Sequence, residues 1–455
     1  MLSLSQALLE HYDAQAPTYQ TYPGFEQFKQ AFGPRHYAQA LEHRRQSVLT
    51  RLKPLSIYVH LPFCEKLCYF CNRDKIVTKR YSKTLAYLEL IEQELKLQVE
   101  HLGGKPKISQ LHLTGGTPTY LHESELESLV TILKSCTVFT PNIDMSLDID
   151  PRTINNHGLA ALHHLGFKRL NFGVQDCDVS VQRAVHRLQD FDAIQGLIEH
   201  SRVLGFECCS LELLYGLPKQ TQRSFEATLS RVLELDSDRV KLTLYRHQPE
   251  HFSPQNKIKA QDLPSKHLAL KLFNTALTTL NQAGYEYIGL DLFAKDGDPL
   301  SVAKRRGSLS RNFLGFGHQP HTDLMALGMS GVGSMGSTYS QNATTLEEYR
   351  LFLERKQLPV VKGCALSRDD LLRKSIIMTL MCQGHVSFDA IDEAYLIDFD
   401  AYFAQEMKQL RRLEAEGLVK LSAKSLDVTE LGRILVRTIA AVFDRYWTPG
   451  LSSTV

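Results

Sequence analysis

The stretch Tyr58-Val59-His60-Leu61-Pro62-Phe63-Cys64-Glu65-Lys66-Leu67-Cys68-Tyr69-Phe70-Cys71 joins an apolar strand to three cysteines with CxxxCxxC spacing. Thiolate is the soft ligand that iron–sulfur clusters require, and three closely spaced thiolates can bind three irons of a [4Fe–4S] cube. The sequence therefore predicts Cys64, Cys68 and Cys71 as cluster ligands.

The fourth iron of such a cube has no protein ligand in this motif. An open iron can chelate the amino group and carboxylate of S-adenosylmethionine (SAM), and an electron from the cluster can then release a 5′-deoxyadenosyl radical. Zinc is a weaker alternative, because no second Cys/His pair follows at the spacing of a zinc finger. Buried structural cysteines are the other alternative.

Short apolar runs alternate with longer helical stretches from residue 55 to about residue 245, which is typical of parallel βα units. The expected strands are Ser56–Leu61, Ile108–Leu113, Ile143–Ile149, Arg169–Val174, Glu207–Leu214 and Val240–Tyr245. The expected helices are Lys83–Leu102, Glu123–Lys134, Asn156–Leu165, Asp178–Leu204 and Gln222–Leu235. Right-handed crossovers would curl six such units into a partial (β/α)6 barrel with its functional loops at the carboxyl ends of the strands.

The rest of the chain predicts two flanking regions. Residues 1–54 read as an N-terminal arm with a helical start and a helix near His36–Thr50. Residues 55–365 would form the barrel with an extension, in which Ser265–Ala283 is helical and Tyr285–Leu290 is a strand. Residues 366–455 are mostly helical, and a ribbon before the last helix is typical of a winged helix. That region has no dense basic helix, so we expect a packing or lid role and no nucleic acid partner.

Composition excludes several functions for a chain of 455 residues. The net charge of +2 does not indicate a polyanionic partner. The nine cysteines lack framework spacing outside the motif, which suits a reducing compartment. We see no export signal and no apolar run long enough to span a membrane, so we expect a cytoplasmic protein.

The cysteine motif and its surroundings resemble the radical SAM superfamily, and within it the oxygen-independent coproporphyrinogen III oxidases. The resemblance runs from about Tyr19 to about Tyr446. It rests on Tyr58–Cys64, Lys66–Cys71, Lys75–Thr78, Gly115–Leu121, Gly173–Asp176 and Tyr215–Thr221. It implies an α/β radical SAM barrel, a [4Fe–4S] cluster, one or two molecules of SAM, and a tetrapyrrole substrate.

The resemblance also implies which residues bind the cofactors. Gly115, Gly116 and Thr117 follow the second strand and match a motif that contacts SAM, where glycine lets the backbone approach closely. Tyr58 and Phe70 match positions near the cluster and the adenine, and Val332 matches an adenine contact. Asp148 would accept hydrogen bonds from the SAM amino group or ribose, where the family generally has Glu. Gln175, Arg187 and Glu212 match the places of polar residues that hold a second SAM, with Glu212 in place of an expected Asp, and Arg246 stands beside that site.

Three further residues depart from the family pattern at or near the expected site. Arg73 replaces a cysteine that is not expected to bind the cluster, and Leu292 replaces a histidine. Arg246 stands where the family has a small residue, so it would either crowd out the second SAM or clamp a carboxylate. The candidate partners of substrate propionates are Arg246, Arg311 and Arg437. Gly315–His318 and Ser330–Gly333 resemble loops that lie near the substrate and SAM.

Three functions fit these observations. The first is oxidative decarboxylation of coproporphyrinogen III to protoporphyrinogen IX, by a monomer that receives electrons from a donor such as flavodoxin or ferredoxin. The second is a diverged paralogue that acts on another tetrapyrrole or transfers a methyl group. The third is haem binding without turnover, with His60, His247 or His318 as iron ligands.

Overall fold

The computed structural model describes residues 17–319 and 322–448. The chain divides into two compact units. The larger unit comprises Phe28–Leu272 and Thr322–Ala365, and the smaller unit comprises the described parts of Met1–Gln27, Phe273–His321 and Leu366–Val455. Our three-part division of the chain into arm, barrel and C-terminal domain stays a prediction.

Six parallel strands form the centre of the larger unit. In chain order they are β1 (Leu55–Leu61), β4 (Lys107–Gly115), β5 (Val138–Ile149), β6 (Arg169–Gln175), β7 (Cys208–Tyr215) and β8 (Arg239–Leu244). Each pairs in parallel with the next. The predicted partial barrel is therefore confirmed, and the loops that follow these strands lie at one end of the sheet.

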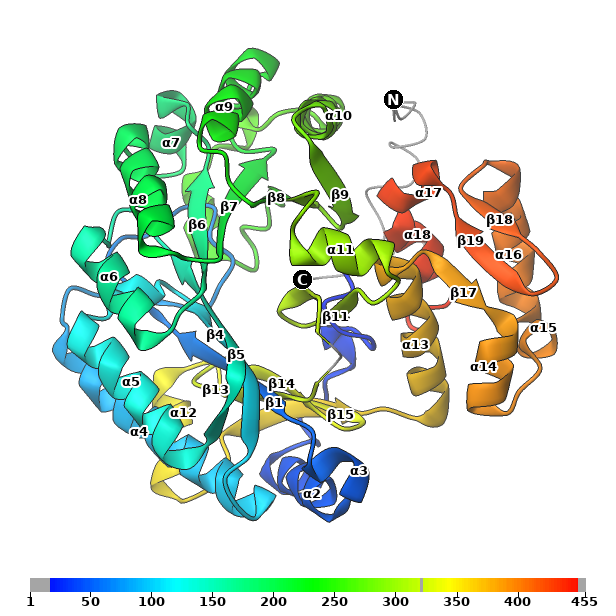
Figure 1. Ribbon diagram of the computed structural model, residues 1–455, viewed down its shortest axis with the longest axis horizontal. Coiled ribbons are helices and arrows are strands. Elements are labelled where there is room, and N and C mark those ends of the chain that lie inside the picture. Colours follow the sequence, from blue (N-terminus) through cyan, green and yellow to red (C-terminus); the bar gives the residue numbers. More distant parts are fainter. Residues whose placement is uncertain (1–16, 320–321, 449–455) are drawn as a thin grey trace. The chain divides into compact units, whose positions relative to one another are not determined.

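Helices cover the outside of these strands (Figure 1). They are α4 (Ser82–Leu102), α5 (Glu123–Cys136), α6 (Asn156–Leu165), α7 (Val179–Ala184), α8 (Phe191–Leu204) and α9 (Gln222–Glu234). The chain enters the barrel through α2 (Pro34–Gln46) and α3 (Val48–Arg51), and 3-10 turns occur at Pro118–Tyr120, Ser253–Lys257 and Ala260–Asp262. The single helix that we expected over Asp178–Leu204 is two helices, because His186 between them has a positive φ of 54°.

Four later strands extend the sheet beyond β1. They are β13 (Leu324–Leu327), β14 (Val332–Met335), β15 (Thr338–Asn342) and β16 (Val360–Ala365), and α12 (Leu346–Glu354) lies between the last two. Strand β13 pairs with β1 in parallel, whereas the others follow antiparallel. The sequence did not predict these strands, because they are short and their side chains are mostly buried without alternation.

A buried carboxylate ties this extension to α4. Glu94 on α4 accepts hydrogen bonds from the backbone N–H of Gly328 at 2.7 Å, from Asn342 Nδ2 at 2.7 Å and from Tyr349 Oη at 2.6 Å. Gln98 Nε2 donates a fourth at 3.0 Å. Burial raises the pKa of Glu94 to about 7, although these hydrogen bonds act to lower it. The network fixes the loop that leads from β13 into β14.

The smaller unit combines hairpins with helices. Its elements in chain order are a 3-10 turn (Phe25–Gln27), β9 (Tyr285–Gly289), β10 (Leu292–Lys295), α11 (Pro299–Arg305), β11 (Ser310–Asn312), β12 (Gly315–Gly317), α13 (Arg368–Cys382), β17 (His385–Ser387), α14 (Phe388–Tyr395), α15 (Phe399–Tyr402), α16 (Ala404–Ala415), β18 (Val419–Leu421), β19 (Ser425–Val428), α17 (Glu430–Ile434) and α18 (Val436–Ala441). Helix α10 (Lys266–Gln282) spans the division between the units. Strands β17, β19 and β18 form a small antiparallel sheet among helices, as the winged-helix interpretation predicted. The helical start that we expected lies in residues 1–16, outside the described residues.

Candidate active site

The cysteine loop is held at both ends by backbone hydrogen bonds. Strand β2 (Phe63–Cys64) pairs in parallel with β3 (Ile76–Val77), so the loop returns to its starting point. Tyr69 N donates to Val185 O at 3.0 Å, and the Tyr69 ring stacks on His186 with centroids 5.0 Å apart. The aromatic side chains of Tyr69 and Phe70 pack on a buried cluster of Val181, Val185, Leu214, Leu217, Tyr245 and Ile258. The loop is thus anchored on the ends of α7, β7 and β8.

The three thiols are near enough to influence one another electrostatically. Cys64 and Cys68 are buried and Cys71 is half-buried. Burial raises the pKa of Cys64 to about 11, and the neighbouring thiols Cys71 and Cys68 raise the same pKa. Such coupling occurs only between groups that lie near one another, so the structure brings the three predicted ligands together.

This donor set fits an iron–sulfur cube better than one metal ion. Within residues 17–319 and 322–448, no three His, Cys, Asp or Glu side chains converge closely enough to bind a single metal ion. A cube binds its thiolates on different irons, so its ligands stand further apart than those of zinc. Thiols with no carboxylate among them are the soft ligands that the cluster requires.

Two arginines approach the sulfur of Cys68. Arg152 Nη2 and Arg187 Nη1 each lie 3.5 Å from Cys68 Sγ. Both guanidiniums also donate to Asp150 Oδ2, at 2.6 Å and 3.0 Å. Burial would raise the pKa of Asp150, but Arg187 and Arg152 lower it to about 2. One carboxylate therefore balances one of the two cations, and a net positive charge remains beside Cys68.

The turn after β4 touches the start of the cysteine loop. Gly116 N donates to Leu61 O at 2.7 Å, and Thr117 N donates to Phe63 O at 2.8 Å. A Cβ on Gly116 would lie 2.6 Å from the carbonyl oxygens of Pro62 and Phe63, so only glycine permits this approach. Thr117 Oγ1 donates to Cys64 Sγ at 3.4 Å. The predicted Gly-Gly-Thr contact with the cofactor region has a physical basis, because the turn and the cluster loop touch.

Arg73 reaches across to Asp148 at the end of β5. Its Nη1 donates to Thr114 Oγ1 at 2.7 Å and lies 3.8 Å from Asp148 Oδ2. Thr114 donates to the same carboxylate. Glu212 on β7 pairs with Lys241 at 2.9 Å, and the charges of Lys241 and Arg73 lower the pKa of Glu212. The departure at Arg73 therefore bears on two of the predicted SAM ligands.

Gln175 and Arg187 each have a buried polar atom without a partner in the described chain. Gln175 Oε1 and Arg187 Nε lack any hydrogen-bond partner among residues 17–319 and 322–448. Gln175 ends β6 with a positive φ of 68°. Buried polar atoms of proteins are nearly always paired, so an unpaired acceptor and donor at neighbouring positions fit a bound polar molecule. Both residues match the expected second SAM site.

Tyr58 and His60 on β1 form a buried pair below the cysteine loop. Tyr58 Oη and His60 Nδ1 are 2.7 Å apart, and His60 Nε2 lies 3.1 Å from Asp74 O. A carbonyl only accepts, so Nε2 carries the hydrogen and Nδ1 accepts from Tyr58. Burial lowers the pKa of His60 to about 4, which keeps the ring neutral. With both nitrogens engaged, His60 is a poor candidate for a haem ligand.

Val332 is linked to the cysteine loop through its neighbour Ser330. The Val332 side chain is buried at the start of β14. Ser330 Oγ donates to Asp74 Oδ2 at 2.7 Å, which ties the two loops together.

Arg246 follows the end of β8 and is half-buried. His247, the next residue, forms a 2.9 Å contact between its Nδ1 and Tyr245 Oη.

Several other candidates lie in the smaller unit. Arg311 donates to Tyr19 O, and its guanidinium is 5.6 Å from the centre of the Phe316 ring. Leu292 and Phe316 pack on a buried apolar cluster of that unit. Arg437 belongs to α18 and His318 follows β12. Their roles toward a substrate stay predictions.

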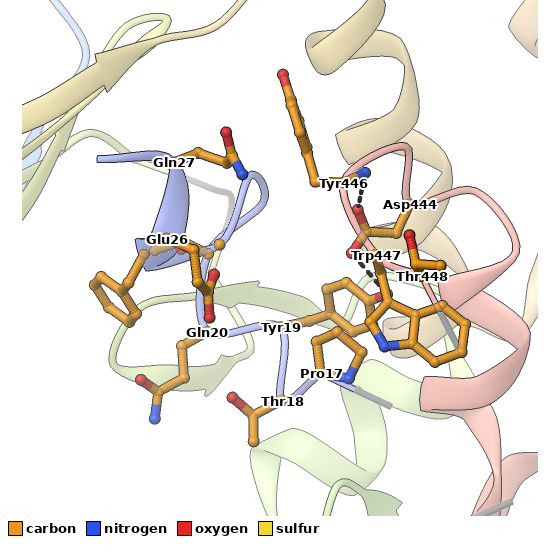
Figure 2. A pocket seen from close by; sticks show the side chains of 13 residues that line it. Pro17, Thr18, Tyr19, Gln20, Glu26, Gln27, Asp444, Tyr446, Trp447 and Thr448 are labelled. Atoms are coloured by element: carbon orange, nitrogen blue, oxygen red, sulfur yellow. Dashed lines mark hydrogen bonds between the residues drawn. The ribbon is translucent and has the colours of Figure 1, made fainter. Parts of the chain in front are cut away.

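The smaller unit also contains a pocket that no prediction included. Figure 2 shows that it is bordered by the chain near Tyr19 and by Asp444, Tyr446 and Trp447. Tyr19 Oη donates to Asp444 Oδ2 at 3.1 Å, and Tyr446 N donates to Asp444 Oδ1 at 2.9 Å. Burial raises the pKa of Asp444. These contacts satisfy the carboxylate within the unit, so the pocket gives no separate indication of a ligand.

Sequence reasoning missed Asp150 and Arg152 as site residues. They follow the predicted Asp148 in the run Asp148-Ile149-Asp150-Pro151-Arg152 at the end of β5. Charged residues directly after a barrel strand are the signal that could have identified them. The contact with Cys68 was not predictable, because the two residues are 84 positions apart.

Comparisons with known proteins give the class first. A model of the Radical SAM superfamily matches residues 58–232, which contain the cysteine loop and the turn after β4. A model of the HemN C-terminal domain matches residues 366–435. The expected cofactors, a [4Fe–4S] cluster and SAM, are thereby confirmed.

Similarity over nearly the whole chain gives the family. The oxygen-independent coproporphyrinogen III oxidase of Salmonella typhimurium strain LT2 is 40% identical over 97% of this chain and 95% of that protein. The enzyme of the same name from Pseudomonas aeruginosa PAO1 is 38% identical over 96% of this chain and 95% of that protein. The solved Escherichia coli coproporphyrinogen III oxidase HemN, described as a radical SAM enzyme, superposes with a TM-score of 0.91 at 38% identity, covering 98% of this chain and 99% of that one. The chain belongs to the oxygen-independent coproporphyrinogen III oxidase family.

Proposed function

We propose that this protein converts two propionate side chains of coproporphyrinogen III into vinyl groups without oxygen, and so forms protoporphyrinogen IX. Each propionate loses a β-hydrogen atom, one electron and carbon dioxide. The observation that carries the proposal is the 40% identity to a coproporphyrinogen oxidase over 97% of the chain. A radical SAM core alone would not identify the substrate.

When bound, the cluster and SAM would supply the radical chemistry that an unactivated carbon–hydrogen bond requires. Cys64, Cys68 and Cys71 would hold the cluster, and the first two of these thiols are buried while Cys71 is half-buried. The turn at Gly116 brings backbone close to the cofactor, and Asp148 accepts hydrogen bonds from SAM.

Further binding roles follow from the unpaired atoms and the resemblance. Gln175 and Arg187 offer an acceptor and a donor to a second SAM molecule. Tyr58 and Phe70 border the cluster and the adenine, and Val332 contacts the adenine. Glu212 and Arg246 complete the proposed SAM residues. The substrate is a tetrapyrrole, the electron donor is a flavodoxin or ferredoxin, and the protein works as a cytoplasmic monomer.

One observation favours a diverged paralogue as the second candidate. Arg73 lies 3.8 Å from Asp148 and its charge lowers the pKa of Glu212, at a position where the family resemblance implies an uncharged cysteine. A change from an uncharged to a cationic residue alters the charge of the ligands that the site can bind. Non-catalytic haem binding gains no support from His60, because both of its ring nitrogens are engaged.

Anaerobic turnover distinguishes these candidates. The reconstituted and reduced protein is given SAM and coproporphyrinogen III, and mass spectrometry follows 5′-deoxyadenosine and the porphyrin together. We expect 5′-deoxyadenosine to rise with vinyl products, and to be absent in a Cys68→Ser variant while a Cys136→Ser variant matches the unmodified protein. Formation of 5′-deoxyadenosine without decarboxylation would refute coproporphyrinogen III as the substrate and favour the diverged paralogue. Stoichiometric haem binding without formation of 5′-deoxyadenosine would refute the proposal that the protein is an enzyme.

The described residues contain no helix that is both long and apolar enough to cross a membrane.

A further inference from the structure

Two acidic side chains, Asp148 on β5 and Glu212 on β7, are partly exposed, and the charge of Arg73 from the cluster loop acts on both. Arg73 Nη1 lies 3.8 Å from Asp148 Oδ2, and the side chains of Arg73 and Asp148 are 42% and 33% exposed. Exposure of this size means that a bound molecule can reach both groups. Arg73 also acts on Glu212, whose pKa its charge helps to lower after the larger effect of Lys241.

The charges at this position are balanced only when Arg73 is included. The carboxylates of Asp148 and Glu212 are matched by the cations of Arg73 and Lys241. Burial lowers the pKa of the adjacent His112, so that ring adds no charge near neutral pH. Without Arg73, one carboxylate charge at the ends of β5 and β7 would be uncompensated, and a cation entering the barrel would be attracted to it.

SAM carries a positive sulfonium and a positive ammonium group against one carboxylate. Its cationic groups therefore favour the position that the Arg73 guanidinium occupies at Asp148. Asp148 has three other polar contacts: Asn171 Nδ2 donates to Oδ1 at 3.1 Å, Thr114 Oγ1 donates to Oδ2 as a neutral hydroxyl, and His112 Nε2 lies 3.7 Å from Oδ1. Arg73 is the charged partner that a cationic ligand would have to replace.

We propose that Arg73 is a specificity-determining residue, which competes with the cationic groups of SAM for Asp148 and thereby sets the affinity for SAM. The inference rests on the proposed role of Asp148 in SAM binding. It predicts that this chain binds SAM more weakly than a form with a small uncharged residue at position 73. The pair is half-exposed, so its electrostatic energy is small and the expected change in affinity is about threefold to fivefold.

The test measures SAM binding directly. Full-length protein with its cluster reconstituted and oxidised is dialysed anaerobically against labelled SAM, so that no SAM is cleaved. We expect Arg73→Ala to bind SAM about threefold to fivefold more tightly than the unmodified protein, and Arg73→Lys to lie between them. Arg51→Ala serves as the matched control, because it removes an exposed arginine before β1, at the opposite end of that strand from the cysteine loop. Iron content and circular dichroism verify that each variant retains cluster and fold.

A second pair of variants tests whether the effect runs through Asp148. In an Asp148→Asn background, Arg73→Ala should leave the SAM affinity unchanged. Unchanged or weaker SAM binding by the single Arg73→Ala variant would overturn the proposal, and so would a full Arg73→Ala effect in the Asp148→Asn background. Tighter SAM binding by Arg73→Ala in a protein that does not decarboxylate coproporphyrinogen III would refute the proposed function and retain this inference.

Discussion

The two guanidiniums beside Cys68 make the reduction potential of the cluster a measurable consequence of the structure. Arg152 Nη2 and Arg187 Nη1 each lie 3.5 Å from Cys68 Sγ, and Asp150 balances only one of them. Reduction adds negative charge to the cluster. A nearby positive charge and N–H···S hydrogen bonds stabilise the reduced form, so they raise the potential. We therefore expect Arg152→Gln to lower it.

The size of the shift can be bounded in two ways. Loss of one hydrogen bond to sulfur costs about 1 kcal/mol, which is about 40 mV for a one-electron couple. Loss of a full charge about 6 Å from the added electron costs about 3 kcal/mol at an effective dielectric constant of about 20, or about 120 mV. The Arg152 side chain is only 14% exposed, so solvent screens it weakly. The expected decrease is about 40 to 120 mV.

The assay is an anaerobic redox titration of the reconstituted protein, followed by electron paramagnetic resonance of the reduced cluster. Arg152→Lys should shift the potential by less than Arg152→Gln, because it keeps the charge and loses the planar fork. Arg51→Gln provides the control for removal of an exposed arginine. A potential for Arg152→Gln within about 10 mV of the unmodified protein, or above it, would refute this reasoning.

The remaining predictions concern the cluster loop and stability. Serine in place of any motif cysteine should abolish most of the bound iron, measured per chain, whereas equal loss from Cys136→Ser would contradict the assignment. Gly116→Ala should reduce iron content and SAM binding, because its Cβ would lie 2.6 Å from the carbonyl oxygens of Pro62 and Phe63; normal values for both would show that the loop can shift. The pKa of Glu94 is raised from 4.5 to about 7, so the folded state binds its proton more tightly and stability falls as pH rises through that window, by about 3 kcal/mol. Denaturant unfolding at pH 5 and pH 8 should show this loss, and an equal loss in Glu94→Gln would contradict it.

The sequence predicted the barrel well because its signals are local. Strand β1 and the cysteines that follow it are contiguous, and the Gly-Gly turn directly follows β4. Each barrel strand is a short apolar run bounded by a helical stretch, so periodicity alone separates them. The extension β13–β16 escaped prediction because its short buried strands have no alternation, and because β13 pairs with β1 across more than 250 intervening residues.

The sequence by itself indicated the class of chemistry and the three cysteines proposed as cluster ligands, since spacing and thiol identity are properties of neighbouring residues. Only the tertiary structure decided what surrounds them. Arg152 meets Cys68 because β5 ends beside the cysteine loop, and Arg73 meets Asp148 for the same reason. These charges are far apart along the chain, and parallel strands bring their carboxyl ends to one edge, where the charges must pair or meet a ligand.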